Sequence, residues 1–380
     1  MKILLTIHHE LNINLGAPGV TWRLGQEYIK LGHEVSYFSF DNLPSFLPSI
    51  VQGILFPEFV ASKVAELVKN QEIDVLDAST GDAWVWSKWS NFFAHQAYPL
   101  VATRSHGLEH AVHLQLLEEV KRGNMKLSWK YPIYHGGFHL WEVANSMRLA
   151  DLVLLLNEYD LGYAVQKLKV QKERAYLVKN GILDTLLNLP LQPLSEDDKI
   201  RIALIGSYIP RKGIHYSIPA LNSILREFPQ VEVSFFGTMV ARNQVIADFD
   251  PELISRVHVV PTYQNSELSA LLAGHCIHLF PSLSEGFGLA VVEAMACGLA
   301  PIVTAIPGPT EIVKHDFDAI VIPPRDVLAI KEALKKLITD HDYLQRLRLN
   351  AYNTAQQYSW TAIAKGNITL YELALAKRTK

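Results

Sequence analysis

One order of sequence patterns occurs twice in this chain, at residues 2–40 and again at residues 200–237. Each copy starts with a short apolar strand candidate (KILLTI, then IRIALIG), passes through a loop into a stretch with helical spacing, and ends in a second strand candidate. When a helix connects two strands, those strands are usually parallel neighbours, because the connection between parallel strands has to cross over the sheet. The repeat therefore predicts an α/β fold with two Rossmann-like, doubly wound domains.

The length of the chain, 380 residues, also favours two domains, because single hydrophobic cores stop growing near roughly 250–300 residues. Residues 184–199 contain two prolines and a cluster of charge, a composition typical of a linker, and we place the boundary near 190–198. We expect a first domain at residues 1–190 and a second at 191–365. A terminal helix at 366–380 is expected to pack back on the first domain.

Composition excludes several classes of protein. Apolar residues make up 49% of the chain and charged residues 19%, with a net charge of −3, so a globular fold is expected and nucleic acid is not the expected partner. The two cysteines, Cys276 and Cys297, form neither a disulfide framework nor a zinc cluster. The apolar start (MKILLTIHHE) is too short for a signal peptide, and no run reaches the roughly 18 apolar residues of a membrane span. We therefore expect a cytoplasmic protein.

Residues 282–298 (SLSEGFGLAVVEAMACG) combine a glycine-rich turn with an apolar helix pattern. Glu285 lies in the turn, and Glu293 lies within the helix, where we expect it to be nearly buried. Gly298 is the expected C-cap. The backbone N–H groups of residues 286–289 would point outward at the helix start and form an anion site.

A nucleotide sugar matches this layout, because it carries hydroxyls at both ends and a diphosphate between them. The diphosphate would lie over the helix N-terminus, with sugar hydroxyls near Glu285 and the ribose diol near Glu293. The alternative is that Glu293 is a structural carboxylate with a buried donor and Glu285 is a solvated loop residue. The spacing alone does not decide between these interpretations.

The stretch SEGFGLAVVEA resembles the Glu-x7-Glu signature of retaining glycosyltransferases of family 4, which have the GT-B fold. Other motifs of that family follow in the family's order: GAPG at 16–19, SHG at 105–107, VKNGI at 178–182, GSYIPRKG at 206–213 and YSW at 358–360. The resemblance implies two Rossmann-like domains facing a central cleft. It also implies transfer of a sugar from a nucleotide donor with retention at the anomeric carbon, without a bound metal.

The resemblance further implies three catalytic residues: Glu285, His106 and Lys212. Donor-binding residues are expected at Gly16, Gly19, Ser207, Arg211, Lys212, Gly237, Thr238, Tyr263, Glu285, Gly286, Phe287, Gly288, Leu289 and Glu293. Ser207 stands where the family usually has arginine, and the adjacent Arg211 is the candidate to supply that second charge. His8, His9, His110 and His135 lie outside these motifs and are expected at the surface or on the acceptor side.

No cofactor and no metal site are predicted, and the donor is a UDP-, GDP- or ADP-sugar. Since metal is absent from this scheme, Lys212, Arg211 and the helix N-terminus near Gly288 must neutralise the departing diphosphate. The acceptor is a glycan, a lipid-linked sugar or a small molecule, and the predicted process is polysaccharide biosynthesis by a hexosyltransferase.

Residues 121–141 (KRGNMKLSWKYPIYHGGFHLW) mix basic and aromatic side chains. This composition suits a membrane surface, here the inner face of the membrane, or a glycan acceptor. The alternative is a pair of core helices joined by Gly136 and Gly137.

Two other functions are alternatives to glycosyl transfer. A Rossmann dehydrogenase would carry G-x-G-x-x-G after a strand, and neither opening strand is followed by that pattern. A non-catalytic, two-lobed protein that binds sugars or nucleotide sugars would share the fold but would not turn over its ligand.

Overall fold

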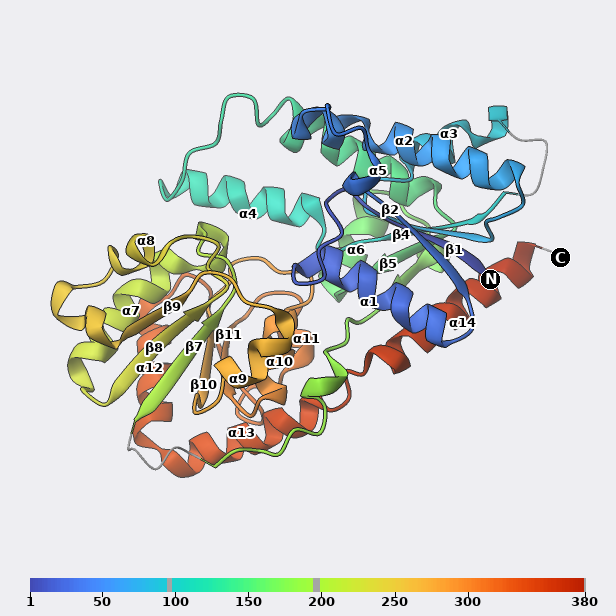
Figure 1. The fold of residues 1–380 in the computed structure, drawn as a ribbon. Helices are drawn as coiled ribbons and strands as arrows, with labels where there is room; N and C mark the ends of the chain where they lie inside the picture. Colours follow the sequence, from blue (N-terminus) through green and yellow to red (C-terminus); the bar gives the residue numbers. More distant parts are fainter. Residues whose placement is uncertain (94–97, 194–198, 379–380) are drawn as a thin grey trace. The chain divides into compact units, whose positions relative to one another are not determined.

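The computed structural model describes residues 1–93, 98–193 and 199–378, and the chain divides into two compact units (Figure 1). The first unit consists of Met1–Leu114, Leu127–Gly181 and Trp360–Lys380, and the second of Gln115–Lys126 and Ile182–Ser359. The predicted linker and boundary include residues 194–198, which lie outside the described residues.

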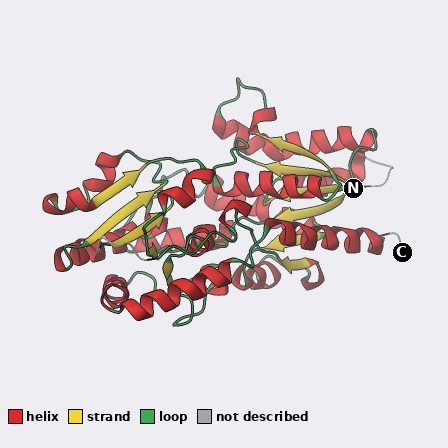
Figure 2. Cartoon of the chain, turned by 60° about the horizontal axis from the view of Figure 1, so that its bottom comes forward, coloured by secondary structure: helices red, strands yellow, loops and turns green. Residues whose placement is uncertain are grey.

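The first unit is built on a six-stranded sheet in the order β2-β1-β3-β4-β5-β6, and every pair of neighbouring strands is parallel. Helices cover both faces of the sheet, so most residues of its central strands β1, β3, β4 and β5 are buried (Figure 2). The strands are β1 (Lys2–Ile7), β2 (Glu34–Ser39), β3 (Val75–Ser79), β4 (Leu100–Arg104), β5 (Leu152–Leu155) and β6 (Ala175–Leu177).

Helices pack on this sheet, and α2, α3, α5 and α6 bury apolar side chains in one core with it. They are α1 (Gly16–Lys30), α2 (Ser49–Lys69), α3 (Trp84–Phe93), α4 (Glu109–Lys121), α5 (His139–Leu149), α6 (Glu158–Gln166) and α14 (Trp360–Arg378). Shorter turns are η1 (Phe40–Asn42), the π-helical η2 (Tyr134–Phe138) and η3 (Lys172–Arg174). From Gln115 onward, α4 is counted with the second unit.

Helix α1 begins earlier than the sequence predicts. The glycine and proline of residues 12–20 (NINLGAPGV) predict a loop through residue 20, but residues 16–19 are the first turn of α1, so that prediction is wrong at Gly16 and Gly19. A side chain at Gly19 would come within 2.7 Å of the Ile13 carbonyl oxygen, so the preceding loop packs directly on this turn. Pro18 is tolerated because a first-turn N–H has no intrahelical acceptor.

The terminal helix α14 is held in the first unit by a buried polar network. Arg104 Nη2 donates to Asp77 Oδ2 at 2.9 Å, and the Tyr371 hydroxyl donates to the same oxygen at 2.6 Å. Tyr28 of α1 lies 3.3 Å from the Tyr371 hydroxyl and accepts a bond from Asn367. This network joins the sheet, α1 and α14 around one charged pair.

Residues 127–141 do not form the helix pair that was the alternative for this segment. Gly136 and Gly137 lie inside the π-helical turn η2, which runs directly into α5. The basic residues Lys121, Arg122 and Lys126 belong to the part of the chain counted with the second unit. The predicted basic and aromatic segment is therefore divided between the two units.

The second unit repeats the architecture, with a parallel six-stranded sheet in the order β12-β11-β10-β7-β8-β9. The strands are β7 (Ile200–Ile205), β8 (Val231–Phe236), β9 (Val257–Val260), β10 (Ile277–Phe280), β11 (Ala300–Thr304) and β12 (Ile320–Ile322). The predicted class of two doubly wound α/β domains is thereby confirmed.

Helices again connect the strands and cover the sheet (Figure 2). They are α7 (Ile214–Glu227), α8 (Arg242–Ile246), α9 (Leu268–Leu271), α10 (Leu289–Ala296), α11 (Pro309–Ile312), α12 (Val327–Thr339) and α13 (His341–Ala355). Short turns are η4 (Asp184–Leu186), η5 (Pro210–Lys212), η6 (Pro251–Arg256) and η7 (Asn265–Glu267).

The 115–126 segment is tied to the rest of the second unit through Glu119, which is fully buried. Arg325 Nε donates to Glu119 Oε1 at 2.6 Å, and Asn124 Nδ2 donates to Oε2 at 2.7 Å. The Tyr216 hydroxyl of α7 lies 3.3 Å from the same Oε2. The carboxylate is thus satisfied on both oxygens, as a buried charge must be.

Candidate functional site

The loop after β7 carries two of the predicted cations and is pressed against the end of β10. Its last residue, Gly213, has a φ of +74°, and a side chain there would approach the Pro281 carbonyl oxygen to 2.0 Å. The Leu283 N–H donates to the Arg211 carbonyl at 2.9 Å. This contact brings residues 206–213 beside the loop that begins at Ser282.

Glu285 meets both cations. Lys212 Nζ donates to Glu285 Oε1 at 2.5 Å, while Arg211 Nη1 lies 3.7 Å from Oε2 and donates to the Ser284 carbonyl at 2.9 Å. The Lys212 ammonium also lies 5.1 Å from the Phe280 ring centroid. Three residues predicted separately from two motifs therefore form one cluster.

The charge state of this cluster follows from its neighbours. Burial alone would raise the pKa of Glu285, but the adjacent Lys212 and Arg211 charges outweigh burial and bring that pKa below its ordinary value. Glu285 is therefore ionised at neutral pH, and the three charges sum to a net positive group. The side chains of Glu285 and Lys212 are 11% and 19% exposed, so a ligand can reach the cluster.

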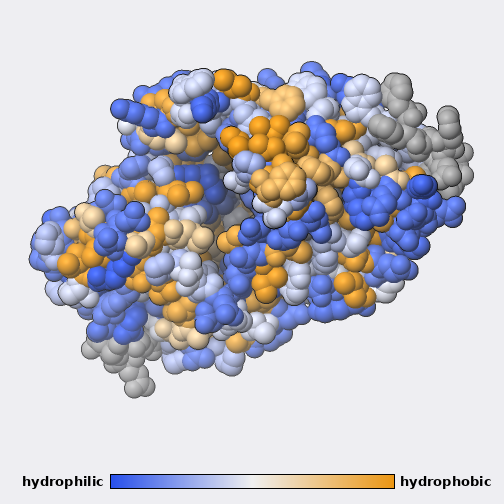
Figure 3. All heavy atoms as spheres, turned by 45° about the horizontal axis from the view of Figure 1, so that its top comes forward, coloured by the Kyte–Doolittle hydropathy of each residue, from blue (hydrophilic) through white to orange (hydrophobic). Residues whose placement is uncertain are grey.

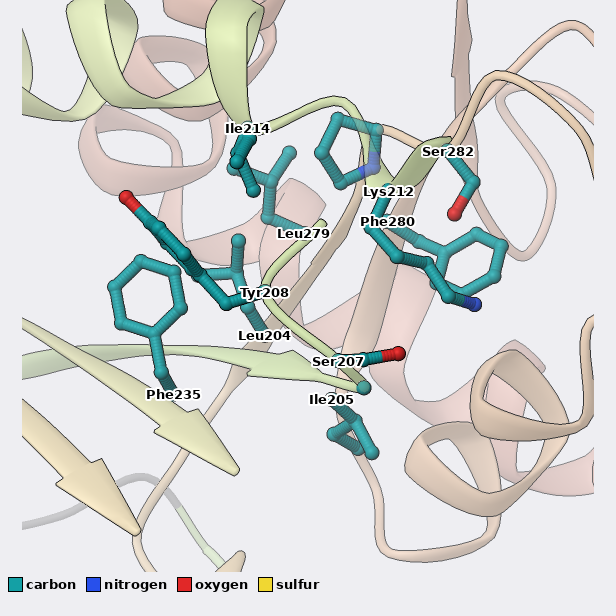
Figure 4. Close-up of a pocket in the computed structure, with 12 residues that line it drawn as sticks. Leu204, Ile205, Ser207, Tyr208, Lys212, Ile214, Phe235, Leu279, Phe280 and Ser282 are labelled. Carbon is teal, nitrogen blue, oxygen red and sulfur yellow. The ribbon is translucent and has the colours of Figure 1, made fainter. Parts of the chain in front are cut away.

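A small open cavity lies beside Lys212 at the carboxyl ends of β7, β8 and β10. Figure 4 shows the polar ends of Ser207, Lys212 and Ser282 on one side of this space, while the Tyr208 ring lies over Phe235 on the other. The Tyr208 hydroxyl donates to Asp248 Oδ2 at 2.5 Å. The lining residues are Leu204, Ile205, Gly206, Ser207, Tyr208, Lys212, Ile214, Phe235, Leu279, Phe280, Pro281 and Ser282. Ligands of open α/β sheets bind at this edge.

The turn before α10 has the predicted arrangement, with one difference at the far end of the helix. Gly288 is the N-cap, in the left-handed region with φ +101°, and Leu289 is the first helical residue. Phe287 is buried and its ring lies 5.8 Å from that of Tyr358, so its side chain belongs to the core. At the other end the C-cap is Cys297, and Gly298 is the left-handed residue after it.

Glu293 is only half-buried, so the expectation of near-complete burial is wrong. Burial raises the pKa of Tyr263 and raises that of Cys297 to about 12. The charge of Glu293 adds to both shifts, so the three side chains are neighbours. Tyr263 also packs on Gly237, where an added side chain would lie 3.0 Å from the ring. Glu293, Tyr263 and Gly237 therefore form a second group, apart from the Lys212 cluster.

Thr238 and Ser207 differ in what they offer a ligand. Thr238 is buried, and its hydroxyl donates to the Val240 carbonyl at 2.8 Å, so the side chain is already used in shaping the backbone. Ser207 is half-buried and lines the cavity.

The site residues predicted in the first unit lie at the carboxyl end of its sheet. His106 follows β4; burial, followed by the Arg104 charge, lowers its pKa to about 3, so the ring is neutral at pH 7. Its Nε2 is buried and has no partner in the part of the chain that the structure describes. Gly16 is exposed, with no atom within 4 Å of where a side chain would begin.

Sequence reasoning missed the histidine and carboxylate pairs of this same edge. His8 Nδ1 lies 2.8 Å from Asp82 Oδ1, and His139 Nδ1 lies 3.3 Å from Glu142 Oε2. The signal that could have found His8 is its position directly after β1, where α/β proteins place ligand-binding residues.

The described residues contain neither a metal-binding cluster nor a membrane-crossing helix. Across residues 1–93, 98–193 and 199–378, no group of three or more His, Cys, Asp or Glu side chains is arranged to hold a metal ion. Within the same ranges, no helix has the length and apolar composition needed to cross a membrane.

Known proteins share sequence similarity with parts of this chain. Residues 190–354 match the family model of glycosyl transferases group 1. The chain is 28% identical to the MMP alpha-(1->4)-mannosyltransferase of Mycolicibacterium hassiacum over 294 residues, which is 75% of this chain and 67% of that protein. In two other curated relatives the match spans 46% and 53% of the relative's own length.

Solved structures resemble the whole chain. Sucrose-phosphate synthase from Thermosynechococcus elongatus superposes with a TM-score of 0.77 at 18% identity, covering 99% of this chain and all of that one. HepE from Anabaena in complex with UDP gives a TM-score of 0.71 at 20% identity, covering 98% and 100%. The fold is GT-B, as in these structures.

Proposed function

We propose that the chain is a retaining, metal-independent glycosyltransferase that moves a hexose from a nucleotide sugar to a glycan, lipid-linked or small-molecule acceptor. The observation that carries this proposal is the cluster of Lys212, Arg211 and Glu285 beside the start of α10. The cluster lies within the residues that match the group 1 glycosyl transferases.

The donor is a UDP-, GDP- or ADP-sugar. Lys212 and Arg211 provide the positive charge that a diphosphate needs, and the N–H groups at the start of α10 add donors aligned with the helix dipole. The Anabaena protein with the same fold holds UDP, which supports a nucleotide as the ligand. Glu293 and Tyr263, the second group of the site, are assigned to the ribose and the base.

The two kinds of charge act at different points of the reaction. Lys212 and Arg211 stabilise the diphosphate as its negative charge grows during bond breaking. Glu285 accepts hydrogen bonds from hydroxyls of the transferred sugar and, being ionised, stabilises the positive charge on the sugar ring. His106, neutral at pH 7, exchanges hydrogen bonds with sugar hydroxyls rather than transferring charge.

Metal independence follows from the same cations. Where a metal-dependent enzyme uses a divalent ion on the diphosphate, this site offers an ammonium and a guanidinium only a few ångströms apart around one carboxylate. Turnover is therefore expected to persist in EDTA. Complete loss that magnesium reverses would contradict this part of the proposal.

A thermal-shift screen over UDP-, GDP- and ADP-sugars tests the donor assignment, because a ligand bound only by the native state raises the melting temperature. Nucleotide release is then measured with the selected donor and a panel of octyl glycosides, and the anomeric configuration of the product is read by NMR. Binding without release under all conditions would identify a non-catalytic binding protein instead. An inverted product would refute retention alone.

The exposed aromatic part of residues 127–141 points to a lipid-linked acceptor at the inner, cytoplasmic face of a membrane. Trp129 is 76% exposed and Ile133 65%, and lysines lie against the aromatic rings: Lys130 over Trp129 at 5.5 Å and Lys88 over Trp141 at 5.4 Å. Helix α2 reaches this surface at Gly53, where an added side chain would lie 3.9 Å from the Tyr134 hydroxyl. Hydrophobic side chains gather in a patch in Figure 3. Aromatic rings with flanking lysines suit the interface of an anionic bilayer.

Flotation with phosphatidylglycerol vesicles tests this contact. Replacing Trp129 and Ile133 with serine should reduce vesicle binding, while the same change at Leu328, an exposed residue of the second unit, should not. Equal vesicle binding by both variants would mean that the aromatic segment does not contact the membrane and only packs within the protein.

A further inference from the structure

The loop after β8 in the second unit exposes one large apolar side chain. This loop, residues 237–240, lies at the carboxyl edge of the sheet, where open α/β sheets bind their ligands. Met239 is 58% exposed there, although the strand before the loop is almost fully buried. Because single exposed apolar side chains are ordinary at protein surfaces, the position of Met239 becomes informative only through its backbone.

The backbone at Met239 is strained. Its φ is +59°, in the left-handed region that residues with a side chain seldom adopt. Gly237 has a φ of +74°, and glycine suits that position because a side chain would lie 3.0 Å from the Tyr263 ring. The loop therefore has two left-handed residues, of which only one is glycine. Strain of this kind persists where the surrounding structure enforces it, and it is concentrated at ligand sites.

Hydrogen bonds on both sides of the loop enforce this conformation. The Met239 N–H donates to the Pro261 carbonyl at 3.0 Å, which ties the loop to the segment after β9. The Thr238 hydroxyl donates to the Val240 carbonyl at 2.8 Å, and the Thr238 carbonyl accepts from the Tyr208 N–H at 2.8 Å. The backbone of Met239 is therefore held between the segments that follow β7 and β9.

The neighbours of this loop indicate which part of a ligand it can contact. The loop that carries Lys212 is bonded to residue 238, and Tyr263, assigned above to the base, packs on residue 237. Met239 therefore adjoins segments that are assigned to the diphosphate and to the base of a nucleotide. A thioether makes favourable contacts with aromatic rings, whereas it offers no hydrogen-bond donor to a phosphate. The nucleobase is the part of the ligand that suits this side chain.

We propose that Met239 contacts the face of the donor's nucleobase and thereby contributes to nucleotide affinity. This inference rests on the nucleotide-sugar function proposed above. It adds a thioether contact to those assigned to Glu293 and Tyr263. Because hydrogen bonds already hold the loop, binding does not have to order its backbone, and more of the contact energy is kept as affinity.

The direct test is the NMR signal of the Met239 methyl group in the whole chain, labelled at its methionine methyl groups. The chain has five methionines, and the Met239 signal is the one that disappears in Met239→Asn. Saturating UDP, GDP or ADP, whichever raises the melting temperature most, should move this signal upfield, because an aromatic ring shields a methyl group over its face. Inorganic pyrophosphate, which has no ring, should leave the signal in place. Met147, buried in the first unit, is the internal reference.

Met239→Asn also separates a ligand contact from a structural role. Asparagine adopts the left-handed region more readily than methionine, so this change removes the thioether without adding strain. Nucleotide affinity by calorimetry should fall about three- to tenfold, while the melting temperature without ligand should stay the same or rise. Phe317→Asn is the matched control, because Phe317 is 51% exposed but precedes β12, at the opposite edge of the same sheet. The control should keep the wild-type affinity.

The outcomes distinguish this inference from the proposed function. If the wild type binds a nucleotide but the Met239 signal stays in place, or Met239→Asn binds the nucleotide equally well, the base contact is wrong and the glycosyltransferase proposal stands. A lower melting temperature with unchanged affinity would assign the side chain to packing. If the wild type binds none of UDP, GDP and ADP, the proposed function fails and the base contact fails with it.

Discussion

Two ion pairs of this protein have similar chemistry and different surroundings. Arg104 and Asp77 pair on the first sheet with exposures of 4% and 1%, and Tyr371 of α14 closes over them with a hydrogen bond to Asp77. Lys212 and Glu285 pair at the edge of the second sheet, where they are 19% and 11% exposed and Lys212 lines a cavity. The first pair is sealed by protein, and the second is open to a ligand.

This difference decides what each pair can do. No substrate can reach Asp77, so its charge serves the native structure, and loss of one partner leaves an uncompensated buried charge. Glu285 and Lys212 can each give up their mutual contact for a ligand group, since a diphosphate can bind the ammonium and sugar hydroxyls can bind the carboxylate. A charge pair near the end of a parallel strand is therefore informative about function only when its exposure is known.

The largest expected effect lies at the sealed pair. Asp77→Ala leaves Arg104 buried without its partner and should lower the free energy of unfolding by about 3–5 kcal/mol. All seven tryptophans lie in the first unit, so urea unfolding followed by tryptophan fluorescence reports on this change. Glu66→Ala is the matched control, because it removes an exposed pair with Lys63 that should contribute about 0–1 kcal/mol. A similar loss of unfolding free energy in both variants would show that the buried pair matters no more to stability than an exposed one.

The next effect concerns affinity at the open site. Glu293→Ala removes the carboxylate assigned to the ribose and should weaken nucleotide binding by about 1.5–3 kcal/mol, the range for a hydrogen bond to a charged group. Turnover at saturating donor should be nearly unchanged. Calorimetric titration with the free nucleotide measures the affinity. Unchanged affinity in a folded variant would assign Glu293 a structural role.

Glu285→Gln should have the opposite profile, with the rate affected rather than the affinity. The amide keeps the size of the side chain but loses the charge that stabilises the sugar ring as positive charge develops on it. Turnover should fall at least about tenfold, which corresponds to about 1.4 kcal/mol. Glu252→Gln, an exposed glutamate of the same unit, is the control. Wild-type turnover at saturating donor would mean that Glu285 has no catalytic part.

The amino-acid sequence predicts those features of the two pairs' surroundings that depend on local residue pattern. The apolar run that ends in glycine, IRIALIG, placed strand β7 before the open site, and the turn before α10 begins where the motif indicates. At residues 16–19 glycine and proline suggest a loop, but the segment is the first turn of α1, where proline is tolerated because a first-turn N–H has no intrahelical acceptor. The near-complete burial expected of Glu293 failed because it depends on neighbours that are distant in sequence.

Neither ion pair could be predicted as a pair. Lys212 and Glu285 are separated by 73 positions, and they meet because the loop after β7 packs on the end of β10, with Gly213 against Pro281 and the Leu283 N–H bonded to the Arg211 carbonyl. Asp77 stands inside a strand pattern, where a lone carboxylate gives no sign of its partner. The Tyr371 hydroxyl that closes the sealed pair comes from 294 positions away. Such contacts are properties of the fold and not of any segment.

The smallest expected effect is the contribution of the open pair to stability. A double-mutant cycle with Lys212→Met and Glu285→Gln should give a coupling of about 1 kcal/mol or less at pH 7, because both side chains are partly exposed. Since Lys212 and Arg211 lower the pKa of Glu285 from 4.5, although burial alone would raise it, the stabilisation is complete above pH 4.5 and is lost only as pH falls through the lower, folded value. Differential scanning calorimetry at several pH values checks this, since the second unit contains no tryptophan. A coupling of several kcal/mol, or one that persists once Glu285 is protonated, would show that the open pair serves the native structure much as Arg104 and Asp77 do. The claim that the open pair serves ligand binding and the sealed pair serves stability would then be wrong.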